Sequence, residues 1–460
     1  MHRVVLLLAL LFATPTLAAP EATVTRTGDR WTVDYRLDQD AAVWAFAQSA
    51  LTIEGRRPWR SELWTVETPG VVLERIGARD VLRAADGGPL PRAVRVRFRP
   101  VHVDLEAAND PYLVFSEGSA ALSADQFDLY PFGSLAEVEA LPHDLNGVPL
   151  KGEPLLVTWR DEAGAVMAAG KRDPAPQTQS YPTYILFGAP PAVAGEGLTA
   201  IVDPGLPVWI GDELKRFEPR IADYYRARLG PGASDSAAVL VSWNGATPGK
   251  TSMGGSTLPG LIATTFEGEG VVEPNPRIAA YVRWFFAHET AHFWFAQRVR
   301  YERSRDAWIT EGAADIMAFK GLKALDPTFD DRRDLQKSVD ECTRFTGDRA
   351  IETAEERGEH RAYYSCGAVF HLVADALMRR SGGDVFDFLK RLLDANADDG
   401  VLTKAEWLTE FDAVSGDPSI AADMRLLIEA GAPSPGDVLA RILERSGVPF
   451  RREEGRVVLL

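Results

Sequence analysis

The sequence predicts an α+β protein, with an all-β part at residues 19–205 followed by a mixed α/β part at residues 206–460 that becomes mostly helical. In the first part, apolar and polar residues alternate with a period of two, for example over residues 31–37 and 94–99. This alternation is typical of strands that bury one face. In the second part, helical spacing and helix-capping residues dominate after about residue 275.

The composition is that of a folded globular protein. The chain has 460 residues, of which 46% are hydrophobic and 25% charged. These values exclude disordered, collagen-like and coiled-coil chains. The 66 acidic residues outnumber the 50 basic ones and give a formal net charge of −16. Because binding to nucleic acid requires a basic face, this balance argues against a nucleic-acid partner.

Residues 1–18 are predicted to be a cleavable signal peptide. A single basic residue, Arg3, precedes an apolar run at residues 4–13, which is too short to span a bilayer. The small residues Thr16 and Ala18 fit a cleavage site. No later apolar run approaches eighteen residues, so we expect no stable membrane span after cleavage. Together with bacterial-type use of Ala and Arg, this predicts a periplasmic or secreted protein; a retained N-terminal anchor is the alternative.

The start of the second part has a mixed pattern. Residues 212–229 have helical spacing and end at a Gly-Pro pair, although Pro219 lies inside them and implies a kink or a later start. Two short apolar segments, at residues 237–243 and 261–266, are expected to form strands.

Two later helices have clear N-terminal signals. Asn275 is a natural N-cap, and Pro276 suits the first helical position. Thr403 followed by Glu406 is a capping box that begins another helix.

The helix that begins at Pro276 carries the sequence His-Glu-Thr-Ala-His at residues 288–292. Residues four apart lie on the same helix face, so the imidazoles of His288 and His292 can bind one metal ion. Glu289 lies beside them, where it can act on a water molecule without being a ligand.

A catalytic zinc site needs a third protein ligand and one open position. Glu311 follows His292 after eighteen intervening residues and is the candidate ligand. Asp315 lies one helical turn later, where it can accept the free N–H of a zinc-bound imidazole. We therefore predict one zinc ion held by His288, His292 and Glu311, with Glu289 as the general base.

This spacing is the gluzincin pattern, and the chain resembles the aminopeptidase N family over about residues 200–380. The family's Trp-apolar-Asn-Glu-Gly segment corresponds to Trp-Ile-Thr-Glu-Gly at residues 308–312. The glycyl aminopeptidase family, which shares the zinc signature and a β domain, is a second resemblance. The resemblance implies a thermolysin-like catalytic domain at residues 206–460, with only a short C-terminal helical extension.

The resemblance also implies a substrate-binding edge strand. The family sequence Gly-Ala-Met-Glu-Asn-Trp-Gly-Leu-Ile corresponds in length and in its last three residues to residues 254–262. The implied substrate residues are Gly254, Gly255, Ser256 and Thr257. Thr257 replaces the glutamate that binds a substrate's α-amine in the family, which mildly favours endopeptidase or relaxed peptidase action over strict aminopeptidase action.

In the family, a tyrosine before Lys-Gly on a later helix stabilises the oxyanion. The segment Tyr-Ser-Cys-Gly at residues 364–367 makes Tyr364 the corresponding residue. Tyr363 is the alternative, and a purely structural tyrosine stays open.

The chain has two cysteines, Cys342 and Cys366. Export would allow them to form a disulfide, which closes a loop of moderate length and would stabilise the fold by roughly 3 kcal/mol. Two free buried thiols are the alternative.

Together these features predict an exported zinc metallopeptidase that acts on peptide or protein substrates. Zinc-activated water would attack the peptide carbonyl, with Glu289 transferring the proton. A zinc endopeptidase, another zinc hydrolase, or a non-catalytic binding protein on the same fold are the alternatives.

Overall fold

The computed structural model describes residues 19–106, 109–195, 198–233 and 237–460. The expected signal peptide at residues 1–18 lies outside them. None of the helices in these ranges combines the length and the apolar character needed to cross a membrane.

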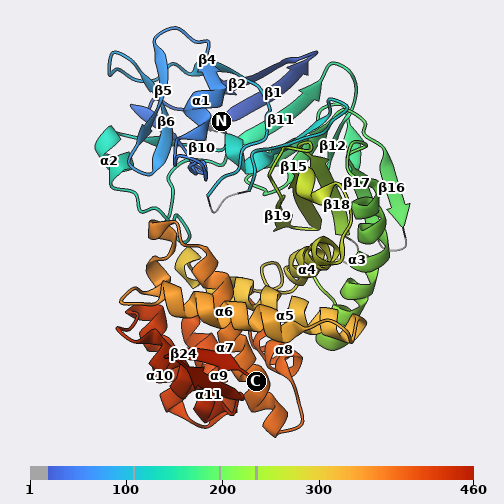
Figure 1. Cartoon of the computed structure of the whole chain (residues 1–460). Coiled ribbons are helices and arrows are strands. Elements are labelled where there is room, and N and C mark those ends of the chain that lie inside the picture. Colours follow the sequence, from blue (N-terminus) through green and yellow to red (C-terminus); the bar gives the residue numbers. More distant parts are fainter. Residues whose placement is uncertain (1–18, 107–108, 196–197, 234–236) are drawn as a thin grey trace, which may run out of the picture.

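The first part of the chain consists of strands arranged in three sheets (Figure 1). A six-stranded sheet has the order β14-β11-β1-β2-β7-β4, a four-stranded sheet β10-β3-β6-β5, and a five-stranded sheet β13-β12-β15-β9-β8. The elements are β1 (Glu21–Thr27), β2 (Arg30–Arg36), β3 (Val43–Phe46), α1 (Trp59–Leu63), β4 (Trp64–Val66), β5 (Val71–Ile76), β6 (Arg79–Ala84), β7 (Ala93–Phe98), β8 (Tyr112–Val114), β9 (Ala120–Ser123), η1 (Ala124–Phe127), β10 (Leu129–Phe132), α2 (Leu135–Glu139), β11 (Leu156–Asp161), β12 (Val166–Ala168), β13 (Lys171–Asp173), β14 (Gln177–Gln179) and β15 (Tyr184–Phe187).

The alternation seen in the sequence is confirmed in β2 and β7, which pair antiparallel. Trp31, Val33 and Tyr35 of β2 are buried, while the residues between them are only partly buried. On the opposite face, Arg95 of β7 forms an exposed ion pair with Asp34. Each strand therefore has one face in the core and one in solvent, as a period of two requires.

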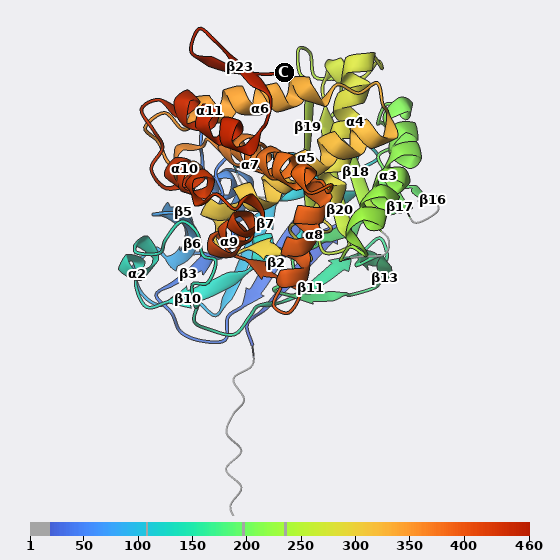
Figure 2. The ribbon, with the colours of Figure 1, turned by 90° about the horizontal axis from the view of Figure 1, so that it is seen from below.

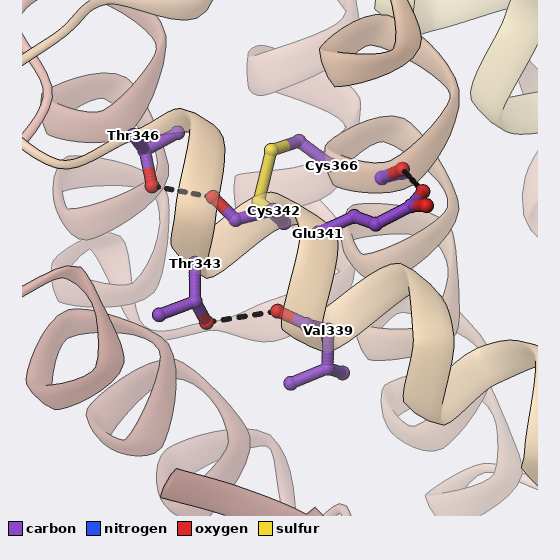
Figure 3. Close-up of a disulfide and its surroundings, with 7 residues drawn as sticks. Val339, Glu341, Cys342, Thr343, Thr346 and Cys366 are labelled. Atoms are coloured by element: carbon purple, nitrogen blue, oxygen red, sulfur yellow. Dashed lines mark hydrogen bonds between the residues drawn. A yellow bond between two sulfur atoms is a disulfide. The ribbon is translucent and has the colours of Figure 1, made fainter. Parts of the chain in front are cut away.

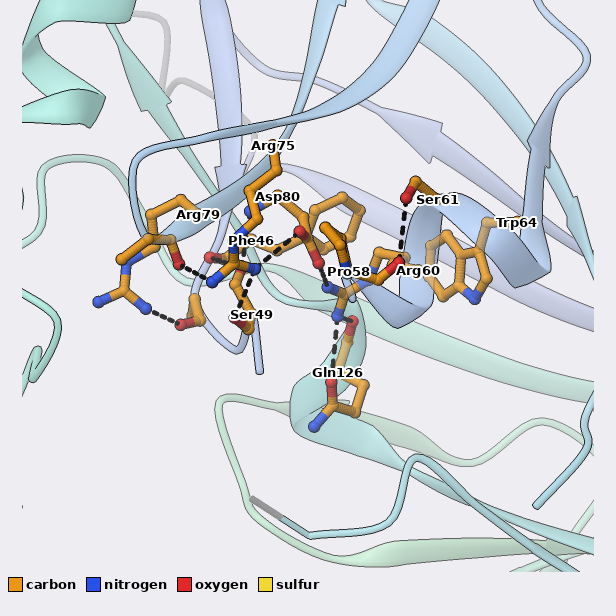
Figure 4. A network of polar contacts seen from close by, with 12 residues as sticks. Phe46, Ser49, Pro58, Arg60, Ser61, Trp64, Arg75, Arg79, Asp80 and Gln126 are labelled. Carbon is orange, nitrogen blue, oxygen red and sulfur yellow. Dashed lines mark hydrogen bonds and ion pairs between the residues drawn. The ribbon is translucent and has the colours of Figure 1, made fainter. Parts of the chain in front are cut away.

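A buried arginine, Arg60, lies in the β part within a network of polar contacts (Figure 4). Arg60 is 0% exposed. Its guanidinium donates to Asp80 Oδ2 at 2.7 Å and to the carbonyl oxygen of Gln126 at 2.8 Å. The ring of Phe46 lies 4.0 Å from the guanidinium carbon. Burial lowers the pKa of Arg60, and the carboxylate of Asp80 acts in the opposite direction. Asp80 therefore compensates a charge that has no access to water.

We expect Asp80→Asn to lower the free energy of unfolding by about 3–5 kcal/mol, since removing one partner leaves a buried charge uncompensated. Asp34→Asn, which breaks the exposed pair with Arg95, should cost less than about 1 kcal/mol. Urea unfolding of both variants measures the difference. Equal losses in the two variants would show that the buried pair carries no special weight.

The second part begins with a five-stranded sheet of order β16-β17-β18-β20-β19. Its strands are β16 (Ala192–Gly195), β17 (Leu198–Val202), β18 (Ala237–Trp243), β19 (Ser252–Leu258) and β20 (Leu261–Glu267). The expected boundary at residue 205 falls after two strands of this sheet. We therefore propose that the boundary lies between β15 and β16, because β17 pairs in parallel with β18.

Helices and a few short strands form the rest of the second part. They lie mostly below the β part in Figure 1, and Figure 2 shows this largely helical layer from below. The elements are α3 (Val208–Leu229), η2 (Glu269–Val271), α4 (Pro276–Ala291), β21 (Arg300–Tyr301), η3 (Ser304–Asp306), α5 (Trp308–Leu325), α6 (Asp331–Phe345), η4 (Ile351–Thr353), η5 (Glu355–Arg357), α7 (Arg361–Arg380), α8 (Val385–Ala395), β22 (Val401–Leu402), α9 (Lys404–Ser415), α10 (Pro418–Glu429), α11 (Pro435–Ser446), β23 (Phe450–Glu453) and β24 (Arg456–Leu459). The predicted α+β class, with a β part followed by a mainly helical part, is confirmed.

The predicted helix starts are also confirmed. The side chain of Asn275 accepts hydrogen bonds from the backbone N–H groups of Arg277 and Ile278 at the start of α4. Both hydrogen bonds of the Thr403–Glu406 capping box are present in α9. In contrast, α3 begins at Val208 and continues through Pro219, so the proline does not delay its start.

An apolar contact layer joins the two parts. Leu113 and Leu186 of the β part pack in one cluster with Ile201, Leu240 and Leu261 of the second part's sheet. The β part therefore supports the sheet whose outer strand, β19, lies nearest to α4.

Candidate metal centre

The two histidines of the motif lie at the end of α4. His288 is in the last turn, and His292 is the C-cap residue. Their Nε2 atoms lie 3.2 Å apart, and both side chains are buried. The i,i+4 spacing on a helix thus brings the two nitrogens together, as the sequence predicted.

Glu311 completes the cluster from the first turn of α5. Its Oε2 lies 3.3 Å from Nε2 of His288 and 3.5 Å from Nε2 of His292. Ligand atoms around a tetrahedral zinc ion, with bonds of about 2.0–2.1 Å, lie about 3.4 Å apart. The three atoms therefore have the spacing of a zinc site. Among the described residues, they form the one group of this kind.

The electrostatics of the cluster also fit a cation. Oε2 of Glu311 is buried and has no hydrogen-bond partner. Burial would raise the pKa of Glu311, but the two histidines hold it well below its ordinary value. Burial would lower the pKa of His288, but the hydrogen bond with Asp315 and the negative charges of Asp315 and Glu311 raise it to about 10. A proton and a metal ion compete for these atoms, and a divalent ion would satisfy all three.

The other nitrogen of each imidazole is also held. Nδ1 of His288 lies 2.9 Å from Oδ1 of Asp315, and Nδ1 of His292 lies 2.8 Å from the carbonyl oxygen of Phe295. If both Nδ1 atoms are donors, both Nε2 lone pairs are free for the metal. The sequence indicated the contact with Asp315. The contact with the carbonyl of Phe295 could not be predicted, because every residue has a backbone carbonyl and the sequence does not indicate which one accepts a hydrogen bond.

Tyr364 lies at this centre and Tyr363 does not. The ring of Tyr364 stacks on the imidazole of His288, with centroids 5.5 Å apart and planes inclined by 18°. The negative charge of Glu311, followed by burial, raises the pKa of Tyr364 well above its ordinary value, so its hydroxyl keeps its proton. The hydroxyl of Tyr363 instead accepts a hydrogen bond from the backbone N–H of Glu355.

Strand β19 brings the four expected substrate residues to the edge of the sheet. Gly254, Gly255, Ser256 and Thr257 pair antiparallel with β20, and no described strand pairs with the other side of β19. A Cβ atom on Gly255 would lie 2.7 Å from Cζ of Phe285 in α4. The glycine therefore allows the strand to lie close to the helix that carries the motif.

Thr257 contacts Glu289 directly. Its hydroxyl lies 3.0 Å from Oε2 of Glu289 and 2.9 Å from the backbone carbonyl oxygen of the same residue. Thr257, the residue that the resemblance aligns with an amine-binding carboxylate, thus donates a hydrogen bond to the motif glutamate. Residue-by-residue comparison with the family did not predict this contact.

The other histidines among the described residues lie elsewhere. His371 is fully buried in α7, where its Nδ1 lies 2.8 Å from the carbonyl oxygen of Gly367 and its Nε2 accepts from Trp407. His102 and His143 belong to the β part and lie beside carboxylates. His360 is the residue before α7.

The two cysteines form a disulfide, which joins α6 to α7 (Figure 3). Cys366 lies two residues after Tyr364 in α7, so the disulfide is attached to the same part of α7 as Tyr364.

No family model matches the sequence, and no curated protein is significantly similar to it. Similar structures have been solved. One is an aminopeptidase N family protein from Idiomarina loihiensis, with a TM-score of 0.55 and 12% identity over 82% of this chain and 70% of that one. Another is leukotriene A4 hydrolase from Saccharomyces cerevisiae, with a TM-score of 0.52 and 11% identity over 90% and 68%. The chain has the gluzincin-like fold of the aminopeptidase N family, as the resemblance implied.

Proposed function

We propose that the protein is a zinc metallopeptidase. The observation that carries this proposal is the set of three ligand atoms 3.2–3.5 Å apart, with Glu289 next to His288 in the last turn of α4. A bound zinc ion supplies Lewis acidity, which polarises a carbonyl and lowers the pKa of a water molecule to about 7. A purely structural zinc site would have no use for a neighbouring general base, which argues against a non-catalytic binding protein.

Residues of the chain supply the proton transfer, the stabilisation of the oxyanion and the binding of the substrate. Glu289 takes a proton from the attacking water and returns it to the leaving amine. Tyr364 donates a hydrogen bond to the substrate oxygen as it gains negative charge. The open edge of β19 offers backbone groups to an extended peptide, which supports peptides as the substrate class.

Thr257 supports relaxed specificity. A carboxylate at this position would favour a substrate ammonium, whereas the hydroxyl is engaged with Glu289. We therefore propose that the enzyme cleaves peptides with or without a free N-terminus; strict aminopeptidase action and a non-peptide substrate are the alternatives.

Matched fluorogenic peptides with free and N-acetylated ends test this proposal, with protein of measured zinc content. We expect one zinc per chain, cleavage of both forms, loss of activity after chelation and its return with zinc. Cleavage of the free forms alone would identify an aminopeptidase with another amine-binding group. Zinc binding without cleavage of any peptide would contradict the peptidase proposal.

The contact between Thr257 and Glu289 gives a further expected result. A hydrogen bond to a charged group contributes about 1.5–3 kcal/mol, so Thr257→Val should lower kcat about tenfold or more. Thr257→Ser keeps the hydroxyl and should stay close to wild type. Steady-state kinetics of both variants measure this, and equal kcat values would show that the hydroxyl does not hold the base.

We also propose that the protein is exported and is periplasmic or secreted. The signal-like residues 1–18 and the disulfide support this, because disulfides persist in oxidising compartments. N-terminal sequencing of the mature protein should give a start near Ala19; an intact Met1 would contradict cleavage.

A further inference from the structure

One acidic side chain of α6 holds the turn of α7 that carries Tyr364. Oε2 of Glu341 accepts hydrogen bonds from Oγ of Ser365 at 2.6 Å and from Nε of Arg361 at 3.2 Å. The guanidinium carbon of Arg361 lies 5.2 Å from the centre of the Tyr364 ring. Glu341 therefore fixes the residue after Tyr364 and also the side chain that packs against its ring.

The disulfide acts on the same turn, from the next residue of α6. Cys342 is bonded to Cys366, and Figure 3 shows Glu341 and this bond side by side between the two helices. Both cysteines are fully buried. A covalent bond and two hydrogen bonds thus connect residues 341–342 to residues 361–366 around Tyr364.

On its other side, this part of α7 lies against the helix of the third ligand. A Cβ atom on Gly312 would lie 2.3 Å from the backbone of Gly367, and one on Gly367 would lie 2.2 Å from the carbonyl oxygen of Trp308. The two glycines let α5 and α7 approach closely at the residue after Glu311. The position of Tyr364 relative to the ligand is therefore set by backbone contact on one side and by α6 on the other.

We propose that Glu341 and the Cys342–Cys366 disulfide are positioning residues that hold the hydroxyl of Tyr364 at the metal centre. This inference rests on the proposed function, in which Tyr364 stabilises the charge that develops on the substrate oxygen. Such a donor is effective only when it is fixed in place before the reaction. A displacement of about 1 Å can cost about a hundredfold in rate.

Kinetics of the Glu341→Ala variant and of the double variant Cys342→Ala/Cys366→Ala test the proposal, below the unfolding temperature of each protein. We expect each to lower kcat about tenfold, with KM within about twofold and the zinc content unchanged. Glu341→Gln, whose amide oxygen can still accept from Ser365, should recover most of the loss. Asp340→Asn is the matched control, since Asp340 is the preceding acid of α6 and bonds Arg456 instead.

The deciding measurement repeats these changes in the Tyr364→Phe background. If Glu341 and the disulfide act through the hydroxyl of Tyr364, their removal should cost less than about twofold there, because contacting groups are not additive. Equal losses in both backgrounds, or no loss in the Tyr364 background, would overturn the proposal. Glu341→Ala keeps the test decisive if the double cysteine variant does not fold.

Failure of the proposed function gives a different result. In that case the wild-type protein would cleave no peptide, whereas hydrogen exchange still reports on the positioning contacts. Glu341→Ala and the double cysteine variant should speed exchange over residues 361–367 and leave residues 308–315 of α5 unchanged. Unchanged exchange over residues 361–367 would overturn the positioning role independently of any activity.

Discussion

Glu289→Gln is expected to lower kcat by about 10³-fold while the zinc content stays at one ion per chain. The amide cannot accept the proton of the attacking water, so the proton-transfer step loses its base. Zinc is retained, because the three ligand atoms belong to His288, His292 and Glu311. The amide can still accept a hydrogen bond from Thr257, so the local fold should be unchanged.

Metal analysis together with peptide hydrolysis measures this result. Glu302→Gln is the matched control, because Glu302 lies on the protein surface ten residues after the motif and its side chain is half exposed. It should have wild-type kcat. Normal hydrolysis by Glu289→Gln would show that another group accepts the proton, and loss of zinc would show that Glu289 supports the metal.

Tyr364→Phe should lower kcat by about 10²–10³-fold, with a much smaller change in KM. The phenol hydroxyl would contact the substrate oxygen only as that oxygen gains charge, so its removal acts mainly on the transition state. The ring that stacks on His288 is kept, and the zinc content should not change.

Tyr363→Phe is the matched control for this variant. It removes a neighbouring hydroxyl that accepts from the backbone of Glu355 and lies away from the metal centre. Its kcat should be close to wild type. If Tyr363→Phe lost as much activity as Tyr364→Phe, the oxyanion role would not belong to Tyr364.

The parts of this site that follow local rules could be predicted from the sequence. His288 and His292 lie on one helix face because of their spacing, and Asn275 marks where that helix begins. Strand β18 has the bounds expected from its apolar run. In each case the residues that form the sequence pattern are the same residues that form the helix or strand, or lie next to them.

The parts that depend on contacts between distant segments could not be predicted. The proposed assignment of β16 and β17 to the second part rests on strand pairing, because β17 pairs with β18 and β16 pairs with β17. The approach of Gly312 to Gly367 depends on two helices crossing 55 positions apart. The contact from Thr257 to Glu289 required the strand and the helix to be placed together, and its residue type alone indicated only the absence of a carboxylate.

Because of the apolar layer between the two parts, we expect them to unfold as one cooperative unit. Residues of β8 and β15 supply one side of the packing around Leu240 and Ile201, so the sheet that ends in β19 completes its hydrophobic core with side chains encoded earlier in the chain. Without those side chains, the second part would expose an apolar face of its sheet to water. The β part thus supports strand β19, so destabilising it would weaken the candidate site, although none of the described residues of the β part belongs to the ligand group.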